Sequence, residues 1–408
     1  MAIDIRNCTA EEIPRFVEVL GTAFGGPIPA EELPRFRDLL EVDRTFAGFD
    51  RETMVATGGT FSFNMTVPGG SSLPTAGVTM VGSLPTHRRQ GTMRRLMRAM
   101  IDDAKEREEP LAALWASEES IYQRFGYGLA SNQGHIKIER DKTRFLGDPL
   151  PVGETRMITL EDAKSVLPPI YDAVLHTRPG MLARSVPWWQ SHTLSDPERT
   201  RGGDSILFCA VFSREGEDEA YAIYRTGGDW DADGVARGYI KVNEVIATNP
   251  IAYREMWRYL FSIDLVEYIK AWYLPQDVPL ELMLLEPRRM RFAKSDSLWL
   301  RLVDVRPALD ARSYTGDGEV RFAVADKFCP WNDGEWTLKV EGGKGNLDKG
   351  GEPEISLDVS ALAAVYLGGY TFAQLGRALR AQECTPGAFA RADSLFRTDV
   401  APWCPENF

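Results

Sequence analysis

The stretch from Met80 to Met100, "MVGSLPTHRRQGTMRRLMRAM", passes from an apolar run through a turn with two arginines and one glycine into a helical pattern. After the turn, apolar residues recur at the spacing of one helix face: Met93, Leu96, Met97, Met100 and Ile101. The first backbone N–H groups of a helix lack partners within the helix, and the helix dipole is positive there. The turn therefore predicts a site for an anion, above all a phosphate.

The residues of the turn and the strand before it suggest a particular ligand. Gly91 lets the backbone approach a ligand closely, and Arg88 and Arg89 can donate charge-assisted hydrogen bonds. The strand that ends at Leu84 can also pair its edge with an amide-containing ligand. A ligand with a diphosphate at one end and an amide-rich arm at the other is coenzyme A.

The segments around the turn predict an α/β sheet. Residues 3–24 read as a short strand followed by a helix with Thr9 at its N-cap, and residues 45–70 and 75–84 read as strands separated by Gly/Pro turns. "LAALWA", residues 111–116, is a short apolar run typical of a buried strand beside a parallel neighbour. The order strand, turn, helix, strand is that of an α/β fold.

The rest of the chain reads as two further blocks. Residues 155–176 and 239–261 repeat the strand–helix style, but the turn in the latter has no glycine and no arginine pair. We interpret them as a second copy of the first fold that lost its phosphate-holding turn; two unrelated strand–helix units are the alternative.

The third block has a different pattern. Three segments alternate apolar and polar residues and predict half-buried antiparallel strands: Val320, Phe322 and Val324; Trp336, Leu338 and Val340; Ile355, Leu357 and Val359. Residues 360–378 then predict two short helices around Gly368–Gly369, so an α+β layer is expected. With a linker at residues 145–154, the predicted domains are 1–150, 151–295 and 296–408.

Composition narrows the class of protein. The chain has 408 residues and a net charge of −12, which argues against a general nucleic-acid binder and suits a cationic small substrate. Its five cysteines are widely spaced and form no CxxC pair, so they suggest a reducing compartment and neither a disulfide framework nor a metal site. No signal peptide and no apolar run long enough to span a membrane are evident, so we expect a cytoplasmic protein.

The turn and two longer motifs resemble a known family. Arg88–Gly91 between a strand and a helix resembles the acyl-CoA motif of the Gcn5-related N-acetyltransferases (GNAT). "PTHRRQG" (85–91), "IYQRFGYG" (121–128), the three blocks and the aromatic last residue together resemble the enhanced intracellular survival (Eis) acetyltransferases over the whole length. The resemblance implies two GNAT-like domains, the second degenerate, followed by a sterol-carrier-protein-like domain, in a homohexamer. It also implies acetylation of aminoglycoside-like amines, or in some members of a protein lysine, from acetyl-CoA.

The resemblance further implies which residues contact acetyl-CoA. Those expected along the pantetheine arm are Val81, Gly82 and Ser83. Those expected around the pyrophosphate are Arg89, Gln90, Gly91, Thr92, Met93 and Arg94. Those expected on the far side of the cofactor are Tyr122 and Gln123. Met93 departs from the general pattern, which has glycine or alanine there.

Two groups are candidates for the proton transfers. Tyr127 is the predicted general acid, because a phenol with a pKa near ~10 can donate to a thiolate whose conjugate acid lies near ~8.5, and Tyr122 is its rival. The four histidines form no recognisable acid–base constellation. The resemblance implies that the α-carboxylate of Phe408 is the general base; a frayed chain end is the alternative.

Three functions stay open at this point. The first is acetyl-CoA-dependent acetylation of aminoglycoside-like amines, with no metal expected. The amine would attack the thioester directly, since no residue pattern for a covalent acyl-enzyme stands out. The second keeps this chemistry and takes a protein lysine as the acceptor. The third is a non-catalytic protein that binds acyl-CoA or a lipid.

Overall fold

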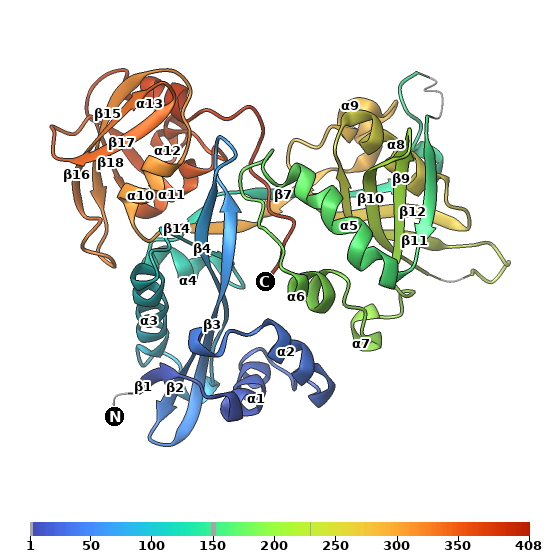
Figure 1. Cartoon of the computed structure of the whole chain (residues 1–408), viewed down its shortest axis with the longest axis horizontal. Helices are drawn as coiled ribbons and strands as arrows, with labels where there is room; N and C mark the ends of the chain where they lie inside the picture. Colours follow the sequence, from blue (N-terminus) through green and yellow to red (C-terminus); the bar gives the residue numbers. More distant parts are fainter. Residues whose placement is uncertain (1–2, 148–151, 229) are drawn as a thin grey trace. The chain divides into compact units, whose positions relative to one another are not determined.

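The computed structural model describes residues 3–147, 152–228 and 230–408 (Figure 1). The chain forms two compact units. Unit 1 comprises Met1–Ser131, Ser297–Pro402 and Glu406–Phe408, and unit 2 comprises Asn132–Asp296 and Trp403–Pro405.

Unit 1 contains a seven-stranded sheet that carries the opening motif. Its strands lie in this order: β1 (Asp4–Asn7), β2 (Thr45–Asp50), β3 (Thr53–Thr66), β4 (Ser72–Ser83), β5 (Leu111–Trp115), β14 (Leu298–Leu302) and β6 (Gly128–Leu129). The helices of this part are α1 (Ile13–Ala23), α2 (Leu33–Leu39), α3 (Thr92–Glu106) and α4 (Glu119–Tyr122). Helices α1 and α3 both contact β3 and β4 and lie on opposite faces of the sheet (Figure 1). Strands covered on both faces explain why the middle of β3 is buried almost continuously.

Helix α3 follows the predicted pattern. Leu96, Met97, Met100 and Ile101 are fully buried, and Met93 packs partly buried against the same cluster. The predicted apolar face is therefore confirmed. Thr9 is likewise confirmed as a helix cap, because it forms a capping box with Glu12 at the turn that leads into α1.

Strands β4 and β5 separate before either strand ends. Their parallel pairing covers only three positions, Thr75↔Leu111 to Gly77↔Ala113, although β4 continues to Ser83 and β5 to Trp115. Just beyond the last pair, Met80 has a positive φ of 54°, and the β3–β4 register shifts there as in a β-bulge. The sheet is therefore open between residues 78–83 and 114–117, next to the start of α3.

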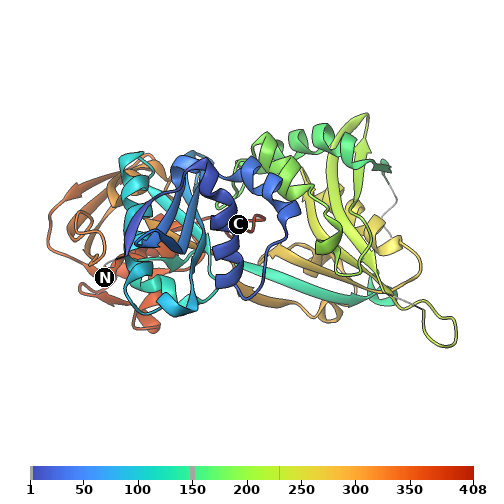
Figure 2. The ribbon, with the colours of Figure 1, turned by 90° about the horizontal axis from the view of Figure 1, so that it is seen from below.

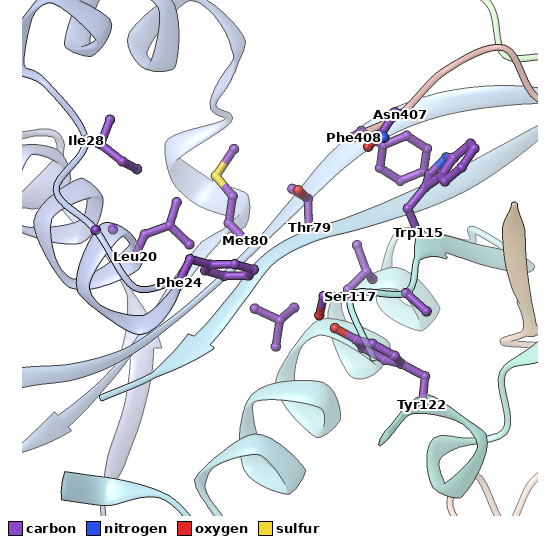
Figure 3. Close-up of a pocket in the computed structure, with 15 residues that line it drawn as sticks. Leu20, Phe24, Ile28, Thr79, Met80, Trp115, Ser117, Tyr122, Asn407 and Phe408 are labelled. Carbon is purple, nitrogen blue, oxygen red and sulfur yellow. The ribbon is translucent and has the colours of Figure 1, made fainter. Parts of the chain in front are cut away.

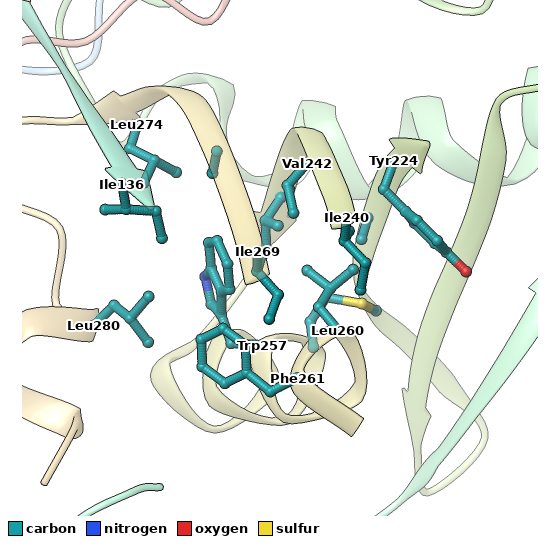
Figure 4. Packing of buried hydrophobic residues seen from close by; sticks show 14 of the residues in the cluster. Ile136, Tyr224, Ile240, Val242, Trp257, Leu260, Phe261, Ile269, Leu274 and Leu280 are labelled. Atoms are coloured by element: carbon teal, nitrogen blue, oxygen red, sulfur yellow. The ribbon is translucent and has the colours of Figure 1, made fainter. Parts of the chain in front are cut away.

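Unit 2 contains the second seven-stranded sheet. Its strands lie in this order: β13 (Ala293–Asp296), β7 (Asn132–Glu139), β12 (Val266–Pro275), β11 (Gly238–Ala247), β10 (Glu217–Gly227), β9 (Phe208–Arg214) and β8 (Glu154–Ile158). Its helices are α5 (Leu160–Leu175), α6 (Val186–Trp188), α7 (Glu198–Arg201), α8 (Pro250–Ser262) and α9 (Leu280–Met283). Trp257 on α8 is fully buried against Ile269 and the neighbouring strands (Figure 4).

The two sheets take strands from unexpected parts of the chain. Strand β7, within residues 1–150, pairs with β12 and β13 in the second sheet. Strand β14, which follows the second block, lies between β5 and β6 in the first sheet. The predicted domain boundaries at residues 150 and 295 stay a prediction. The chain passes from unit 1 to unit 2 after Ser131 and returns to unit 1 at Ser297.

A five-stranded sheet completes unit 1. Its order is β17 (Lys344–Lys349), β16 (Gly334–Glu341), β15 (Gly318–Ala325), β18 (Ile355–Asp358) and β19 (Ala381–Glu383). Its helices are α10 (Val305–Ala311), α11 (Val359–Tyr366), α12 (Phe372–Arg377) and α13 (Ala388–Phe396), so the two helices predicted around Gly368–Gly369 are confirmed.

One predicted direction in this sheet is wrong. Strand β18 pairs parallel to β15, not antiparallel, because the chain leaves β17 at one edge and returns on the other side of β15. The alternation of apolar residues reports which face is buried and carries no strand direction. Val359, which we placed on this strand, begins α11 instead.

Among the described residues, no helix is long and apolar enough to cross a membrane.

Candidate active site

A cavity of about 930 Å³ opens at the start of α3. Its walls come from the end of β4, the turn into α3, and the segment 117–125. Of the residues predicted to contact acetyl-CoA, the following line it: Val81, Gly82, Ser83, Arg89, Gly91, Thr92, Met93 and Arg94. Gln90 and Gln123 are not among its lining residues, and Tyr122 lines a second cavity.

The N-terminus of α3 faces this cavity without a protein cap. Gly91 is the N-cap with a φ of 79°, and within the described part of the chain no side-chain cap accepts a hydrogen bond from the first amides of the helix. A Cβ placed on Gly91 would have no atom within 4 Å, so the backbone lies open. The hydroxyl of Thr92 is buried and has no hydrogen-bond partner among the described residues. These groups can accept an anion such as a phosphate.

The corresponding helix of unit 2, α8, has a side-chain cap at its N-terminus. The side chain of Asn249 caps α8 by accepting from the backbone N–H of Ala252 at 3.0 Å. Because that amide is satisfied by the protein itself, it is not offered to a ligand. The second copy therefore lacks the open helix start that the first copy has.

The cavity at α3 is basic in an acidic protein. One glutamate, Glu118, and four arginines line it. The arginines are Arg88, Arg89, Arg94 and Arg124. Arg88 is held at the wall by donating to the backbone oxygen of Ala23 at 3.2 Å. Arg124 lies within the motif "IYQRFGYG" but was not predicted to line the site, because its position on the cavity wall depends on how α4 packs.

A second cavity of about 480 Å³ lies where β4 and β5 separate (Figure 3). It shares Phe24, Val81 and Ser117 with the basic cavity, so the two spaces meet at these residues. The chemistry-bearing groups of its lining are Tyr122 and the two last residues, Asn407 and Phe408. We call it the inner cavity.

Tyr122 presents its hydroxyl to the inner cavity next to Ser117 (Figure 3). Burial raises the pKa of the Tyr122 phenol, and a hydrogen bond with the Ser117 side chain opposes this effect. A phenol with a raised pKa stays protonated at neutral pH and can act as a proton donor.

Tyr127 occupies a different environment. Its side chain is fully buried, its hydroxyl has no hydrogen-bond partner among the described residues, and it lines neither cavity. Burial raises the pKa of Tyr127 far above its ordinary value. Its ring lies 6.1 Å from that of Tyr122, edge to face, so it packs behind the tyrosine that does reach the cavity. This position does not support the role predicted for Tyr127.

Phe408, the last residue of the chain, also lines the inner cavity (Figure 3). The C-terminus is marked in the two ribbon views (Figures 1 and 2). The Phe408 ring packs against Phe63 of β3, with centroids 5.0 Å apart. Gly77 makes room for this contact, because a Cβ at that position would lie 2.4 Å from the Phe63 ring and 3.4 Å from Phe408. The structure therefore brings Tyr122 and Phe408, predicted as candidates from sequence, to one cavity.

Among the ranges that the structure describes, no group of three or more His, Cys, Asp or Glu side chains could hold a metal ion. All five cysteines are free thiols. The arrangement offers a phosphate site, a phenol and a chain terminus around two joined cavities.

Three family models match the chain. An acetyltransferase (GNAT) domain matches residues 4–130, a second acetyltransferase (GNAT) domain matches residues 180–306, and a sterol carrier protein domain matches residues 305–405. The matches agree with two α/β sheets followed by the α+β layer.

Relatives cover the whole chain. An N-acetyltransferase of Streptomyces avermitilis is 39% identical and covers 100% of both chains. The N-acetyltransferase Eis of Mycobacterium tuberculosis is 29% identical over 98% of both chains. The crystal structure of Eis1 from Mycobacterium abscessus matches with a TM-score of 0.86 at 33% identity, covering 99% of this chain and 100% of that one.

Proposed function

Because the chain belongs to the Eis family of GNAT N-acetyltransferases, we propose that it transfers the acetyl group of acetyl-CoA to an amine in the inner cavity, with Tyr122 as the general acid and the α-carboxylate of Phe408 as the general base. The observation that carries the proposal is the meeting of the two cavities. The basic cavity at the open start of α3 joins the space that Tyr122 and Phe408 line.

The residues at the basic cavity fit the phosphates of acetyl-CoA. The open backbone at Gly91, the buried Thr92 hydroxyl and the four arginines can hold a diphosphate. Val81, Gly82 and Ser83 would run beside the pantetheine arm, since they line the same cavity and lie on the part of β4 that has separated from β5. Acetyl-CoA bound in this way would supply its thioester as the acyl donor.

Tyr122 is the proposed acid in place of Tyr127. The departing thiolate needs a proton, and the phenol that reaches the inner cavity is Tyr122. The hydrogen bond with Ser117 fixes the position of its oxygen at the place where the two cavities meet. A positioned general acid typically contributes about 10²–10⁴-fold to a rate.

The α-carboxylate of Phe408 is the proposed base. Phe63 and Gly77 hold its ring, which fixes the terminus in the inner cavity. A carboxylate in such a position can accept the proton that the attacking amine loses.

The identity of the acceptor and the oligomeric state are not addressed by the geometry of the two cavities. An aminoglycoside-like or protein-lysine acceptor and a hexamer follow from the resemblance and stay predictions. Analytical ultracentrifugation of the full chain measures the oligomeric state. Mass spectrometry of candidate protein acceptors after incubation with acetyl-CoA separates a lysine acceptor from a small amine.

The direct test is thiol release. The purified chain is incubated with acetyl-CoA and a panel of small amines, and free coenzyme A is followed with a thiol reagent. We expect amine-dependent release and an N-acetylated product in the mass spectrum. Acetyl-CoA binding without amine-dependent release from any acceptor, including protein, would favour the non-catalytic alternative.

A further inference from the structure

The walls of the inner cavity indicate the chemical class of its acceptor. We infer that the acceptor is a monoamine carried on an apolar or aromatic body, not a polycation. The inference rests on the proposed function and specifies its substrate.

Apolar side chains dominate the lining of the inner cavity. They are Leu20, Phe24, Ile28, Val78, Met80, Val81, Trp115, Ala116 and the ring of Phe408. Leu20, Phe24, Ile28 and Met80 gather at one end, away from Asn407 and Phe408 (Figure 3). Phe24 is 59% exposed, so its ring offers apolar surface that a ligand can cover. Burying such a surface favours binding of an apolar body.

Charged side chains are missing from the same lining. None of the described residues that line the inner cavity has an acidic or basic side chain, and the polar ones are Thr79, Ser117, Tyr122 and Asn407. The proposed α-carboxylate of Phe408 is then the single anion. One ammonium group can find a counterion there, but each further ammonium of a polycation would lose its hydration without gaining a partner.

An apolar wall also helps the chemistry. An acceptor that arrives as an ammonium ion must first release one proton to water, and desolvation favours this step because it disfavours the charged form of an amine. The amine nitrogen then attacks the acetyl carbonyl carbon, a C–N bond forms and the C–S bond breaks. The proton of the amine passes to the Phe408 carboxylate, and the Tyr122 proton passes to the thiolate. The products are the acetamide and free coenzyme A, and the two residues exchange protons with water to restore their starting forms.

A neighbouring cavity gives a long body room to continue. A space of about 570 Å³ shares Gly26 and Ile28 with the inner cavity, and apolar residues again form most of its wall, Val17 and Leu33 among them. Its single acidic side chain, Glu18, is already paired with Arg15 at 2.7 Å. This space therefore extends the apolar path without adding a free anion.

The test compares acceptors that differ in charge. For the full chain with acetyl-CoA, kcat/KM is measured for 2-phenylethylamine against kanamycin, and for hexylamine against hexamethylenediamine, which has the same carbon chain and a second amine. We expect the monoamine to be favoured in each comparison by about tenfold or more. Equal or better use of the polyamines would overturn the inference and leave the proposed function standing.

If no amine is acetylated, the proposed function fails, and binding still decides the inference. Calorimetric titration of 2-phenylethylamine and kanamycin into the chain saturated with coenzyme A shows which class the cavity takes. Tighter binding of 2-phenylethylamine supports the inference, whereas equal or tighter binding of kanamycin contradicts it.

A variant tests the role of wall charge directly. Gly26 lines the inner cavity, a Cβ there would meet nothing within 4 Å, and its backbone φ is not in the left-handed range. Gly26→Asp adds one anion, so it should raise the preference for hexamethylenediamine over hexylamine, measured as the ratio of their kcat/KM values, by about fivefold or more. Gly26→Asn has the same shape without the charge and should leave the ratio unchanged. If both variants move the ratio equally, charge is not what excludes polycations.

Discussion

The ring of Phe408 packs on the ring of Phe63 with centroids 5.0 Å apart and an interplanar angle of 59°. The contact fixes the last residue on strand β3, beside the point where β4 and β5 separate. A chain end is ordinarily the least ordered part of a protein. Here its contacts place it in the cavity that Tyr122 lines.

Deleting Phe408 should lower kcat by about 10²-fold or more, because the proposed base is lost. The new α-carboxylate, on Asn407, is set back by one residue and has no ring to hold it against Phe63. The Kd for acetyl-CoA should stay nearly unchanged, since its proposed phosphate site is at α3. Phe408→Tyr is the matched control: it keeps the α-carboxylate and an aromatic ring that can pack on Phe63, so it should lose far less activity. Steady-state kinetics and calorimetry measure both quantities, and equal losses in the two variants would argue against the carboxylate.

Tyr122→Phe and Tyr127→Phe should behave differently. The first removes the proposed acid and should lower kcat by about 10²-fold. The second removes a buried hydroxyl that has no partner among the described residues, so it should leave kcat nearly unchanged and the melting temperature equal or higher. Kinetics and thermal unfolding of the two variants measure this. The reverse pattern of activity would restore Tyr127 as the acid.

Arg124→Gln should weaken acetyl-CoA binding about fivefold or more and leave the binding of acetyl-pantetheine, which lacks the nucleotide phosphates, unchanged. The reason is that Arg124 lines the basic cavity and can contact a phosphate. Arg377→Gln, which changes an exposed arginine on α12 outside both cavities, is the control. A loss of acetyl-pantetheine binding equal to that of acetyl-CoA would show that Arg124 acts on folding and not on phosphates.

Asp326→Ala should destabilise the chain by about 3–5 kcal/mol, because it leaves the guanidinium of Arg301 buried without its counterion. Arg301 also lies against Gly126, where a Cβ would come 1.7 Å from Nη1, so it supports the turn that follows Tyr122. Asp348→Ala breaks the exposed pair with Arg306 and should cost less than about 1 kcal/mol. Denaturant unfolding measures both, and similar costs would contradict the argument from burial.

The alkaline side of the pH profile should follow Tyr122. Burial raises the pKa of this phenol, so it keeps its proton up to and beyond the ordinary value near ~10. We therefore expect kcat to show no alkaline decline below about pH 9, measured with a saturating acceptor. An alkaline limb well below this pH, absent in Tyr122→Phe, would show that the phenol titrates lower than its surroundings imply.

Much of the fold could be predicted because its signals are local. The apolar spacing of α3, the Thr9 cap and the glycine before α3 each depend on residues within one or two helical turns. The same holds for the alternating strands β15 and β16. For these elements the sequence pattern and the backbone agree.

The strand exchange could not be predicted in the same way. Strand β14 lies between β5 and β6 although nearly two hundred residues separate it from β5 along the chain, and β18 runs parallel to β15. Pairing partners and directions depend on the path of the whole chain, and a periodic pattern in one segment contains no information about them.

For the candidate site, the sequence by itself determined the open, basic start of α3, because a glycine cap, unpartnered amides and neighbouring arginines are properties of one short segment. Tertiary structure alone decided which tyrosine reaches the cavity. Tyr122 and Tyr127 are five residues apart, and the left-handed turn at Gly126 sends the second ring into the core behind the first. It also decided the character of the wall of the inner cavity, because residues from α1, β4, β5 and the chain terminus meet there only after folding.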